Sequence, residues 1–497
     1  MLASPISALM TQVSRAASST VLAVTDDKQQ AWDSIDLGKL VEFLASEAPH
    51  FAAEFERIVS LSQGNLSLIL YADGITPGSI LTAENKRKEV IWYASFLEFG
   101  HKLSYEEVWV TIATLKNTLV AKHPAGWSGC TRAILHRLFI DQDVAGKGFV
   151  ALGKVVRVSF HNLLGDEEAL NHMWYIKGAS GTVPCAIACS CVNKPLKADE
   201  ENGIQGLASR DDAIVDITCS DFTRMHFRTD NDVWTLADQV AAATKEDRAL
   251  EQQMTGINYH ENAVLFDMAL RRHVRPTSNT FDPMHILYAN GIVNSEVMLF
   301  LHDAKEEHEV TFTEVRTSLQ DWSYPKSWVY TPPAAAFSAH REKTSHDSLK
   351  CSATELLSVY PALRHFVLEA LSASKALTAQ RESLLALFRV CDLVKEATRL
   401  KQNTDDVEPL ARDLEEASSE YLHAFRIAYG PQAMKFKHHL VMHLASQLRR
   451  DKRLLTCWAL ERKHIGAKQS LEHYHDHQNM RLGGIARMMN LQVPRAL

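Results

Sequence analysis

The chain has 497 residues, 46% of them hydrophobic and 23% charged, with a formal net charge of −7 at pH 7. This composition argues against wholesale disorder, and the acidic balance argues against a protein coated in basic surface. No apolar run approaches the roughly 20 residues that cross a bilayer, so the sequence predicts a soluble protein without a membrane partner. The length allows two or three domains, or one large domain with an insertion.

The N-terminal segment, residues 1–62, combines a polar start with helical periodicity. Its first 25 residues contain no acid and a single basic residue, Arg15, which predicts a disordered tail rather than an organelle presequence. Apolar positions at helical spacing over 31–62 predict one or two helices after this tail.

Candidate strands follow the helices. The stretch "SLILYAD" (67–73) is short and apolar, and Gly74 and Pro77 come directly after it, which predicts a buried strand that runs into a loop. The segments 88–99 and 105–115 are further candidate strands, although 105–115 fits a helix equally well.

A helix and another strand come next. Residues 130–141 have helical spacing, and 148–178 predict strands ending near Leu164, followed by Asp166 and a helix. Because strands precede and follow a helix, the order predicts an α/β layer built around a sheet.

The second half of the chain is mainly helical in character from about residue 232. The apolar spacing predicts helices over 355–400, 407–428 and 437–475. Pro, Ala and Ser residues in 321–348 indicate a loop or linker between helical parts.

Three acids could meet at a metal. Asp73 and Asp166 stand at or just after predicted strand ends, and Glu461 lies on a late predicted helix inside a basic stretch. Carboxylates gathered in this way hold Mg²⁺ or Mn²⁺ ions that promote phosphodiester chemistry. Each acid also has a structural interpretation: Asp73 as a turn former, Asp166 as a helix N-cap, and Glu461 as the partner of Arg462 or Lys463.

Four segments resemble, in this order, blocks of transposase-like proteins of dinoflagellates and related protists, which are distantly similar to ribonuclease-H-like DDE transposases. The segments are "LILYADGITPGSILTAENKRKEVIWYASFLEFG", "FHNLLGDEEALNHMWYIKGASGTVPCAIAC", "FDPMHILYANGIVNSEV" and "KFKHHLVMHLASQLRRDKRLLTCWALERKH". The blocks span most of residues 66–468, and their combination is more specific than any one of them.

The resemblance implies a ribonuclease-H-like α/β fold: a mixed sheet with flanking helices, a large helical insertion and a C-terminal helical region. It implies that 63–180 form the first part of the catalytic core, 181–430 a Cys-containing segment and helical insertion, and 431–497 helices that complete the core. It also implies that Asp73, Asp166 and Glu461 are the catalytic acids and bind Mg²⁺ or Mn²⁺.

Three further residues are accessory candidates. Asp282 competes with Glu461 for the third acidic position, because the insertion between Asp166 and Glu461 is long. Asp282 and His285 lie one helical turn apart, which fits a helix start first and an active-site accessory second. His464 shares a helix face with Glu461 and could steady its carboxylate or contact a phosphate.

DNA is the expected partner, and a local basic stretch is the expected contact. Between Lys435 and Lys468 nine basic residues stand against two acids, Asp451 and Glu461, a local net charge of +7. A solvated helix face is the alternative interpretation. The resemblance further implies a homo-oligomer and a nuclear location, with a cytoplasmic location as the alternative. The basic residues are Lys435, Lys437, Arg449, Arg450, Lys452, Arg453, Arg462, Lys463 and Lys468.

The eight cysteines are scattered except near "PCAIACSC", which favours a reducing compartment over a disulfide framework. Cys185, Cys189 and Cys191 are close enough in sequence to share a structural Zn²⁺, with Cys219 or His226 completing a tetrahedral site. Small buried thiols are the alternative.

The leading functional hypothesis is a transposon-derived enzyme that cleaves DNA phosphodiesters and transfers strands with divalent metals. The alternative is a catalytically inactive relic that binds DNA or another partner. Residues 1–60 are not basic, unlike the DNA-binding module that such transposases carry near one end, and this favours the relic. The presence of all three acids favours the enzyme.

Overall fold

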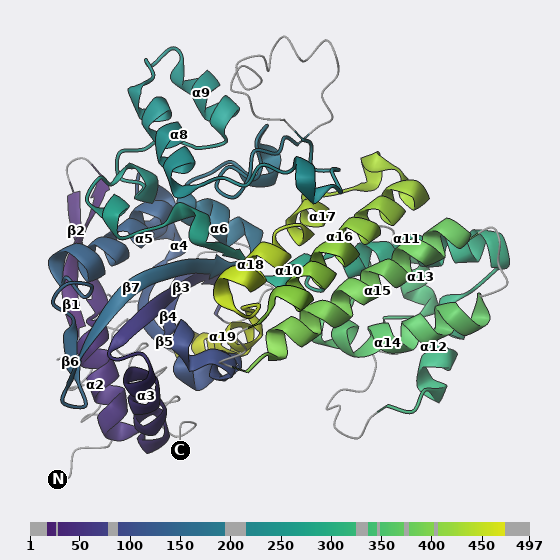
Figure 1. The fold of residues 1–497 in the computed structure, drawn as a ribbon, viewed down its shortest axis with the longest axis horizontal. Coiled ribbons are helices and arrows are strands. Elements are labelled where there is room, and N and C mark those ends of the chain that lie inside the picture. The colour runs from purple at the N-terminus through teal and green to yellow at the C-terminus, as the bar shows by residue number, and fades with distance from the viewer. Residues whose placement is uncertain are drawn as a thin grey trace. The chain divides into compact units, whose positions relative to one another are not determined.

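The computed structural model divides the protein into two compact units. Unit 1 comprises Met1–Cys189, Phe227–Thr280 and Cys457–Leu497, and unit 2 comprises Ser190–His226 and Phe281–Thr456. Figure 1 shows the elements of both. The residues described are 17–25, 28–77, 88–193, 215–324, 336–344, 348–371, 377–401 and 406–472.

Unit 1 is built on a mixed sheet. The strand order is β5 (Val110–Lys116), β4 (Glu89–Phe96), β3 (Asn65–Ile75), β7 (Lys154–Gly165) and β6 (Phe149–Ala151), and β8 (Asn279–Phe281) also pairs with β7. The β3–β4, β4–β5 and β6–β7 pairs are antiparallel, whereas β3 and β7 are parallel. The predicted mixed α/β class is therefore confirmed.

The central strands are buried because their residues suit a covered sheet. Every residue of β4 is buried, and the large rings of Tyr71, Trp92 and Tyr93 are among the fully buried side chains. Trp92 Nε1 still donates a hydrogen bond to Thr131 Oγ1 at 3.2 Å, so its burial leaves no polar atom unsatisfied. Residues 97–104, predicted in part as strand, form a 3₁₀ helix, and β5 begins later than predicted, at Val110.

The N-terminal region differs from the prediction. Strands β1 (Ala17–Thr25) and β2 (Lys28–Ile35) pair as an antiparallel hairpin, where a tail and the start of a helix were expected. Long-range contacts explain the difference, because the buried Trp32 indole donates to Thr114 O at 3.0 Å. The helices α2 (Leu37–Glu47) and α3 (Pro49–Leu61) then follow, as their periodicity predicts.

Unit 1 contains six further α-helices among the described residues. They are α4 (Asn117–Val120), α5 (Gly126–His136), α6 (Glu167–Trp174), α8 (Asp230–Ala242), α9 (Arg248–Thr255) and α19 (Trp458–Glu472). Asp166 caps α6 by accepting a hydrogen bond from Ala169 N at 2.7 Å, and the left-handed Tyr175 (φ 63°) ends the helix. The helix predicted after Asp166 is confirmed.

Unit 2 is mainly helical, as predicted. Its longest helices, α15 (Thr378–Arg399) and α16 (Glu408–Tyr429), pack against each other (Figure 1). The remaining helices are α10 (Pro283–Leu287), α11 (Ile292–His308), α12 (Phe312–Asp321), α13 (Ala339–Thr344), α14 (Ala353–Ala370), α17 (Phe436–Val441) and α18 (Leu444–Asp451).

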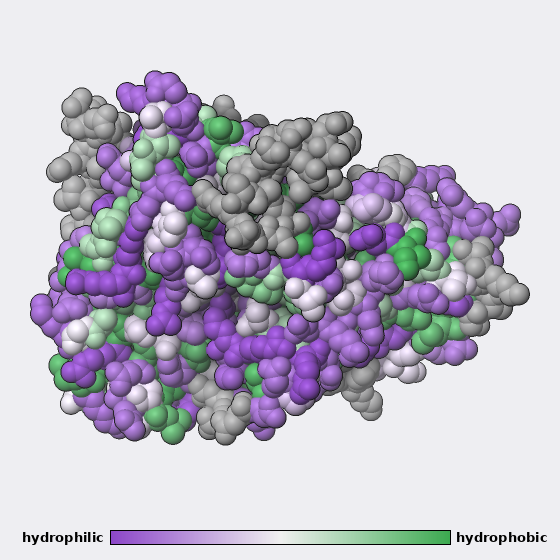
Figure 2. Space-filling view, turned by 45° about the horizontal axis from the view of Figure 1, so that its top comes forward, coloured by the Kyte–Doolittle hydropathy of each residue, from purple (hydrophilic) through white to green (hydrophobic). Residues whose placement is uncertain are grey.

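Two helix predictions need correction. The continuous helical stretch predicted over 437–475 is broken, because Lys452 adopts a left-handed conformation (φ 58°) that ends α18 before α19 begins. The linker predicted over 321–348 contains α13, while its residues 325–335 and 345–347 lie outside the described part. Polar residues dominate the face shown in Figure 2, and apolar residues are scattered among them.

Unit 2 contains a buried acid, Glu296, that was not among the predicted site residues. Glu296 of α11 is fully buried and accepts a hydrogen bond from Ser383 Oγ at 2.6 Å. Burial raises the pKa of this carboxyl from its ordinary value of 4.5 to about 8. The folded protein therefore holds a proton on Glu296 at neutral pH.

Replacing Glu296 by glutamine should remove a pH dependence of stability. A raised folded-state pKa contributes stability that is complete below pH 4.5 and is lost as pH rises through about 8. Relative to the E296Q variant, the wild-type protein should lose on the order of 3–5 kcal/mol between pH 4 and pH 9. Thermal unfolding at a series of pH values measures this, and parallel curves for the two proteins would contradict it.

Candidate functional site

Two acids lie at the same level of neighbouring parallel strands. In the β3–β7 register Tyr71 is opposite Leu164, and Asp73 and Asp166 each follow two residues later. The carboxyl ends of parallel strands meet at one edge of a sheet, where ligands commonly bind. Strand β3 continues to Ile75, so Asp73 lies within the strand rather than at its end as predicted.

Neighbouring groups hold the Asp73 carboxylate. Its Oδ1 accepts a hydrogen bond from Gly74 N at 2.6 Å, and its Oδ2 accepts one from Tyr71 Oη at 3.3 Å. The side chain remains 28% exposed, so an oxygen can reach a ligand.

Helix α19 brings two more groups to Asp73. His464 Nδ1 lies 3.6 Å from Asp73 Oδ2 and 3.7 Å from Glu461 Oε2. The imidazole is 4% exposed and packs near the rings of Tyr71 and Tyr93, with centroids 5.9 and 5.7 Å away. Ligand atoms of Asp73, Glu461 and His464 all lie within 4.8 Å of one another, so they form one candidate metal-binding group.

The contacts of α19 fix this arrangement. Arg462 Nη2 donates to Ser104 O at 2.8 Å, and Lys463 Nζ donates to Glu106 O at 3.3 Å. The Lys463 ammonium also lies 5.7 Å from the centre of the Tyr93 ring. These contacts tie the helix to the segments before β5 and orient Glu461 and His464 toward Asp73.

Burial and neighbouring acids disfavour the charged form of Asp73. Burial raises the pKa of Asp73 from 3.8 to about 6, the nearby His464 opposes this rise, and Asp166 and Glu461 add to it. Like charges gathered around a partly buried carboxylate favour the binding of a cation or a proton.

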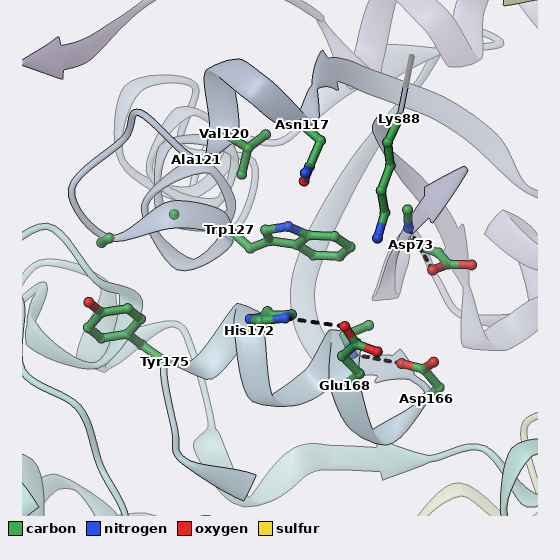
Figure 3. A pocket seen from close by; sticks show the side chains of 14 residues that line it. Asp73, Lys88, Asn117, Val120, Ala121, Trp127, Asp166, Glu168, His172 and Tyr175 are labelled. Atoms are coloured by element: carbon green, nitrogen blue, oxygen red, sulfur yellow. Dashed lines mark hydrogen bonds and ion pairs between the residues drawn. The ribbon is translucent and has the colours of Figure 1, made fainter. Parts of the chain in front are cut away.

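Asp166 faces the same cavity as Asp73 but has a second role. Both acids line the cavity shown in Figure 3, where Asp166 caps α6 through its bond to Ala169 N. Asp166 is not a member of the group formed by Asp73, Glu461 and His464. The structure thus brings Asp166 to the cavity beside Asp73, while one of its carboxylate oxygens accepts a hydrogen bond from the first turn of α6.

Asp282 and His285 begin a helix of unit 2. Asp282 caps α10 by accepting hydrogen bonds from Met284 N and His285 N at 3.1 and 3.3 Å. Its Oδ2 also lies 2.5 Å from His285 Nδ1. The group that contains Asp73 includes Glu461 rather than Asp282.

Most of the nine basic residues are engaged within the protein. Lys437 Nζ donates to His285 O, Ala289 O and Asn290 O, and Arg453 is 7% exposed and donates to Thr398 O. Arg449 pairs with Glu408 and Glu415, Arg450 with Asp451, Lys435 with Ser295, and Arg462 and Lys463 anchor α19 as described. Lys452 and Lys468 are exposed.

A second candidate group combines thiols and imidazoles. The turn that holds Cys185 and Cys189 is closed by a hydrogen bond from Cys189 N to Cys185 O at 3.1 Å, and Cys191 follows two residues later. Cys191 Sγ lies 3.3 Å from His439 Nε2, which lies 3.1 Å from His443 Nε2. Cys191, His439 and His443 all belong to unit 2, so this buried group of one thiol and two imidazoles could bind a metal such as zinc.

The predicted zinc ligands of unit 2 are brought together only in part. Cys191 contacts His439, whereas Cys219 Sγ donates to Asp221 O at 3.6 Å. The sequence prediction did not include His439 and His443 among the ligands, although their spacing of four residues puts two imidazoles on one helical face.

The sequence interpretation missed several residues that surround Asp73. Tyr71 and Tyr93 enclose His464, and Lys88 and Trp127 line the adjoining cavity. Tyr71 lies two residues from Asp73, so the alternation of a strand could have placed both side chains on one face. Nothing local in the sequence pointed to Trp127.

Comparisons with known proteins give no indication of the function. The chain matches no protein-family model, and a search of curated proteins finds no match. Among the described helices none is both long enough and apolar enough to cross a bilayer.

Proposed function

We propose that this protein cleaves DNA phosphodiesters and transfers DNA strands with divalent metal ions, using a ribonuclease-H-like core. The observation that carries the proposal is the meeting of Asp73, Glu461 and His464 beside Asp166 at one edge of a mixed sheet. Acids from two neighbouring parallel strands and a late helix are what the resemblance to DDE transposases leads one to expect.

The residues present fit Mg²⁺ or Mn²⁺. Carboxylate oxygens are the preferred ligands of these hard cations, and Asp73, Asp166 and Glu461 provide them. The buried atoms His464 Nε2 and Tyr93 Oη have no hydrogen-bond partner among the described residues, which is consistent with a site completed by water or ligand. When bound, such ions activate the attacking oxygen and stabilise the leaving oxygen of a phosphodiester.

The other residues position the acids and the substrate. His464 Nδ1 lies close to both carboxylates, those of Asp73 and Glu461, and would position them through these contacts. The Tyr71 hydroxyl orients Asp73 through its hydrogen bond. Lys88 contributes an ammonium group beside Asp73, which would attract a phosphate. No covalent bond between protein and DNA is needed.

The DNA contact is proposed to involve Lys88 and Lys468 of unit 1 more than the whole stretch from Lys435 to Lys468, since most basic groups of that stretch bind other parts of the protein. A homo-oligomer and a nuclear location remain part of the proposal on the strength of the resemblance alone.

Nicking of supercoiled plasmid by the purified protein tests the function. The proposal predicts nicking with Mn²⁺ or Mg²⁺ and none with Ca²⁺ or EDTA. Protein that binds the plasmid without nicking it under any of these metals would favour the inactive relic instead.

We further propose that Cys191, His439 and His443 of unit 2 bind a structural Zn²⁺. One thiolate and two imidazoles supply three of the four ligands of a tetrahedral site, and burial of all three residues fits a structural role. Zinc held in this way would stabilise the fold, because metal binding free energy adds to folding free energy.

Zinc content tests this second site. Protein from zinc-supplemented growth should contain about one zinc ion per chain, and Cys191→Ser or His443→Ala should lose it and unfold at a temperature about 10 °C lower. The half-buried Cys351, outside the cluster, provides a matched Cys351→Ser control that should keep the zinc. Equal zinc content in all variants would contradict the assignment.

A further inference from the structure

A cavity of about 410 Å³ adjoins the acids of unit 1. Asp73 and Asp166 lie at one end, and Trp127 of α5 forms part of the wall (Figure 3). Cavities of a few hundred cubic ångströms suit a small planar group and its substituents. The carboxylates of Asp73 and Asp166 and the indole of Trp127 therefore line the same cavity.

Trp127 is supported on the protein side. Its ring centroid is 6.4 Å from that of Trp92 and 5.5 Å from that of His172, and the indole is half-buried. His172 is itself 53% exposed and is held loosely by Glu168 at 3.6 Å. The half-buried indole is thus open to a planar ligand from the cavity.

Gly74 leaves the room for this arrangement. A Cβ atom at Gly74 would lie 2.4 Å from Lys88 Cε and 3.6 Å from Trp127 Cζ2. The missing side chain lets the Lys88 chain cross the strand directly after Asp73, toward the indole. An ammonium, an aromatic ring and a candidate metal ligand consequently meet within a few ångströms.

Asn117 adds a hydrogen-bonding group to the same wall. Its backbone N–H donates to Lys88 O at 2.8 Å, which fixes the two residues relative to each other. Figure 3 shows the Asn117 amide on the side of the cavity that also holds Lys88 and Trp127. An amide can donate to and accept from the edge of a nucleobase.

We propose that this cavity binds one nucleobase of the DNA strand, stacked on Trp127, beside the phosphodiester that the acids address. The proposal rests on the proposed function and names the part of the substrate that the cavity recognises. An aromatic ring stacks on any base, Lys88 faces the adjoining phosphate, and Asn117 faces the base edge. A nucleotide that is not part of a strand would lack the neighbouring phosphodiester and should bind far more weakly.

Binding of fluorescent single-stranded oligonucleotides, measured by anisotropy in Ca²⁺, tests the proposal. Trp127→Ala should weaken binding between about 5-fold and 100-fold, and Trp127→Phe should bind within about threefold of wild type. The half-buried Trp234, on α8 of the same unit, provides a matched Trp234→Ala control that should bind normally. Thermal unfolding checks that each variant is folded.

A series of oligonucleotides, each lacking the base at one position, tests whether a base stacks on Trp127. An abasic position keeps the backbone and removes only the base. For wild type one position should weaken binding as much as Trp127→Ala does, whereas the Trp127→Ala variant should be insensitive to that position. Equal sensitivity of both proteins at every position would overturn the proposal. So would equal affinity for a free deoxynucleotide and the oligonucleotide.

Plasmid nicking distinguishes a failure of the proposed base site from a failure of the proposed function. Metal-dependent nicking together with equal abasic profiles would overturn the base site and leave the proposed function intact. Loss of nicking under all metals together with a Trp127-dependent abasic profile would support the base site and remove the proposed function.

Discussion

Replacing Asp73 by asparagine is expected to lower Mn²⁺-dependent DNA nicking by at least about 10³-fold while it stabilises the metal-free protein at pH 8. The loss of activity follows because asparagine keeps the shape of the side chain but removes the charge that binds the metal. The gain in stability follows because a partly buried carboxylate near Asp166 and Glu461 is unfavourable without a cation.

The sign of the stability change depends on pH. The folded-state pKa of Asp73 is raised to about 6 from 3.8, so the stability that this group contributes is complete below pH 3.8 and is lost as pH rises through about 6. D73N should therefore match wild type near pH 4 and exceed it by on the order of 1–3 kcal/mol at pH 8. Mn²⁺ should stabilise wild type and leave D73N unchanged.

Thermal unfolding with EDTA and with Mn²⁺, alongside the nicking assay, checks both effects. Asp413 is exposed on α16, so Asp413→Asn serves as a matched control without effect on either quantity. A D73N protein that nicks DNA at the wild-type rate would contradict the catalytic assignment of Asp73.

Glu461→Gln is expected to lower nicking as much as D73N, whereas Asp282→Asn should leave it within about twofold. Glu461 belongs to the group around Asp73, and Asp282 caps α10 in unit 2. Asparagine is as good an N-cap as aspartate, so D282N should also fold normally.

Comparing the two variants identifies the third acid. The reverse pattern, with D282N inactive and E461Q active, would assign that position to Asp282. Mn²⁺ titration should give the same order, with weaker binding by E461Q and unchanged binding by D282N.

The strand and helix next to the site were predicted close to their observed positions, because each is marked by a pattern of a few neighbouring residues. The apolar run before Asp73 and the cap at Asp166 are read over a few residues, and β3 and α6 stand close to where they were expected. The β1–β2 hairpin was missed because Trp32 finds its partner Thr114 far away in sequence. Long-range contacts of this kind override local helical spacing.

The sequence indicated the acids of the candidate site, but it did not indicate how the strands and basic residues around them are arranged. Strand ends suggested Asp73 and Asp166, but the parallel pairing of β3 with β7 that sets them level depends on the fold. The charge of the basic stretch was visible, yet counting charges cannot show that Arg453 is buried or that Lys437 binds three carbonyl oxygens. Cys191 and His439 are 248 residues apart in the chain, beyond any spacing rule.

Asp73, Asp166 and Glu461 are proposed to share divalent metal, and crystals of the full chain soaked in Mn²⁺ test this through their anomalous difference density. We expect at least one Mn²⁺ peak within bonding distance of Asp73 and Glu461, with Asp166 as a further ligand. Mn²⁺ bound elsewhere in the crystal, with no peak at these carboxylates, would contradict it.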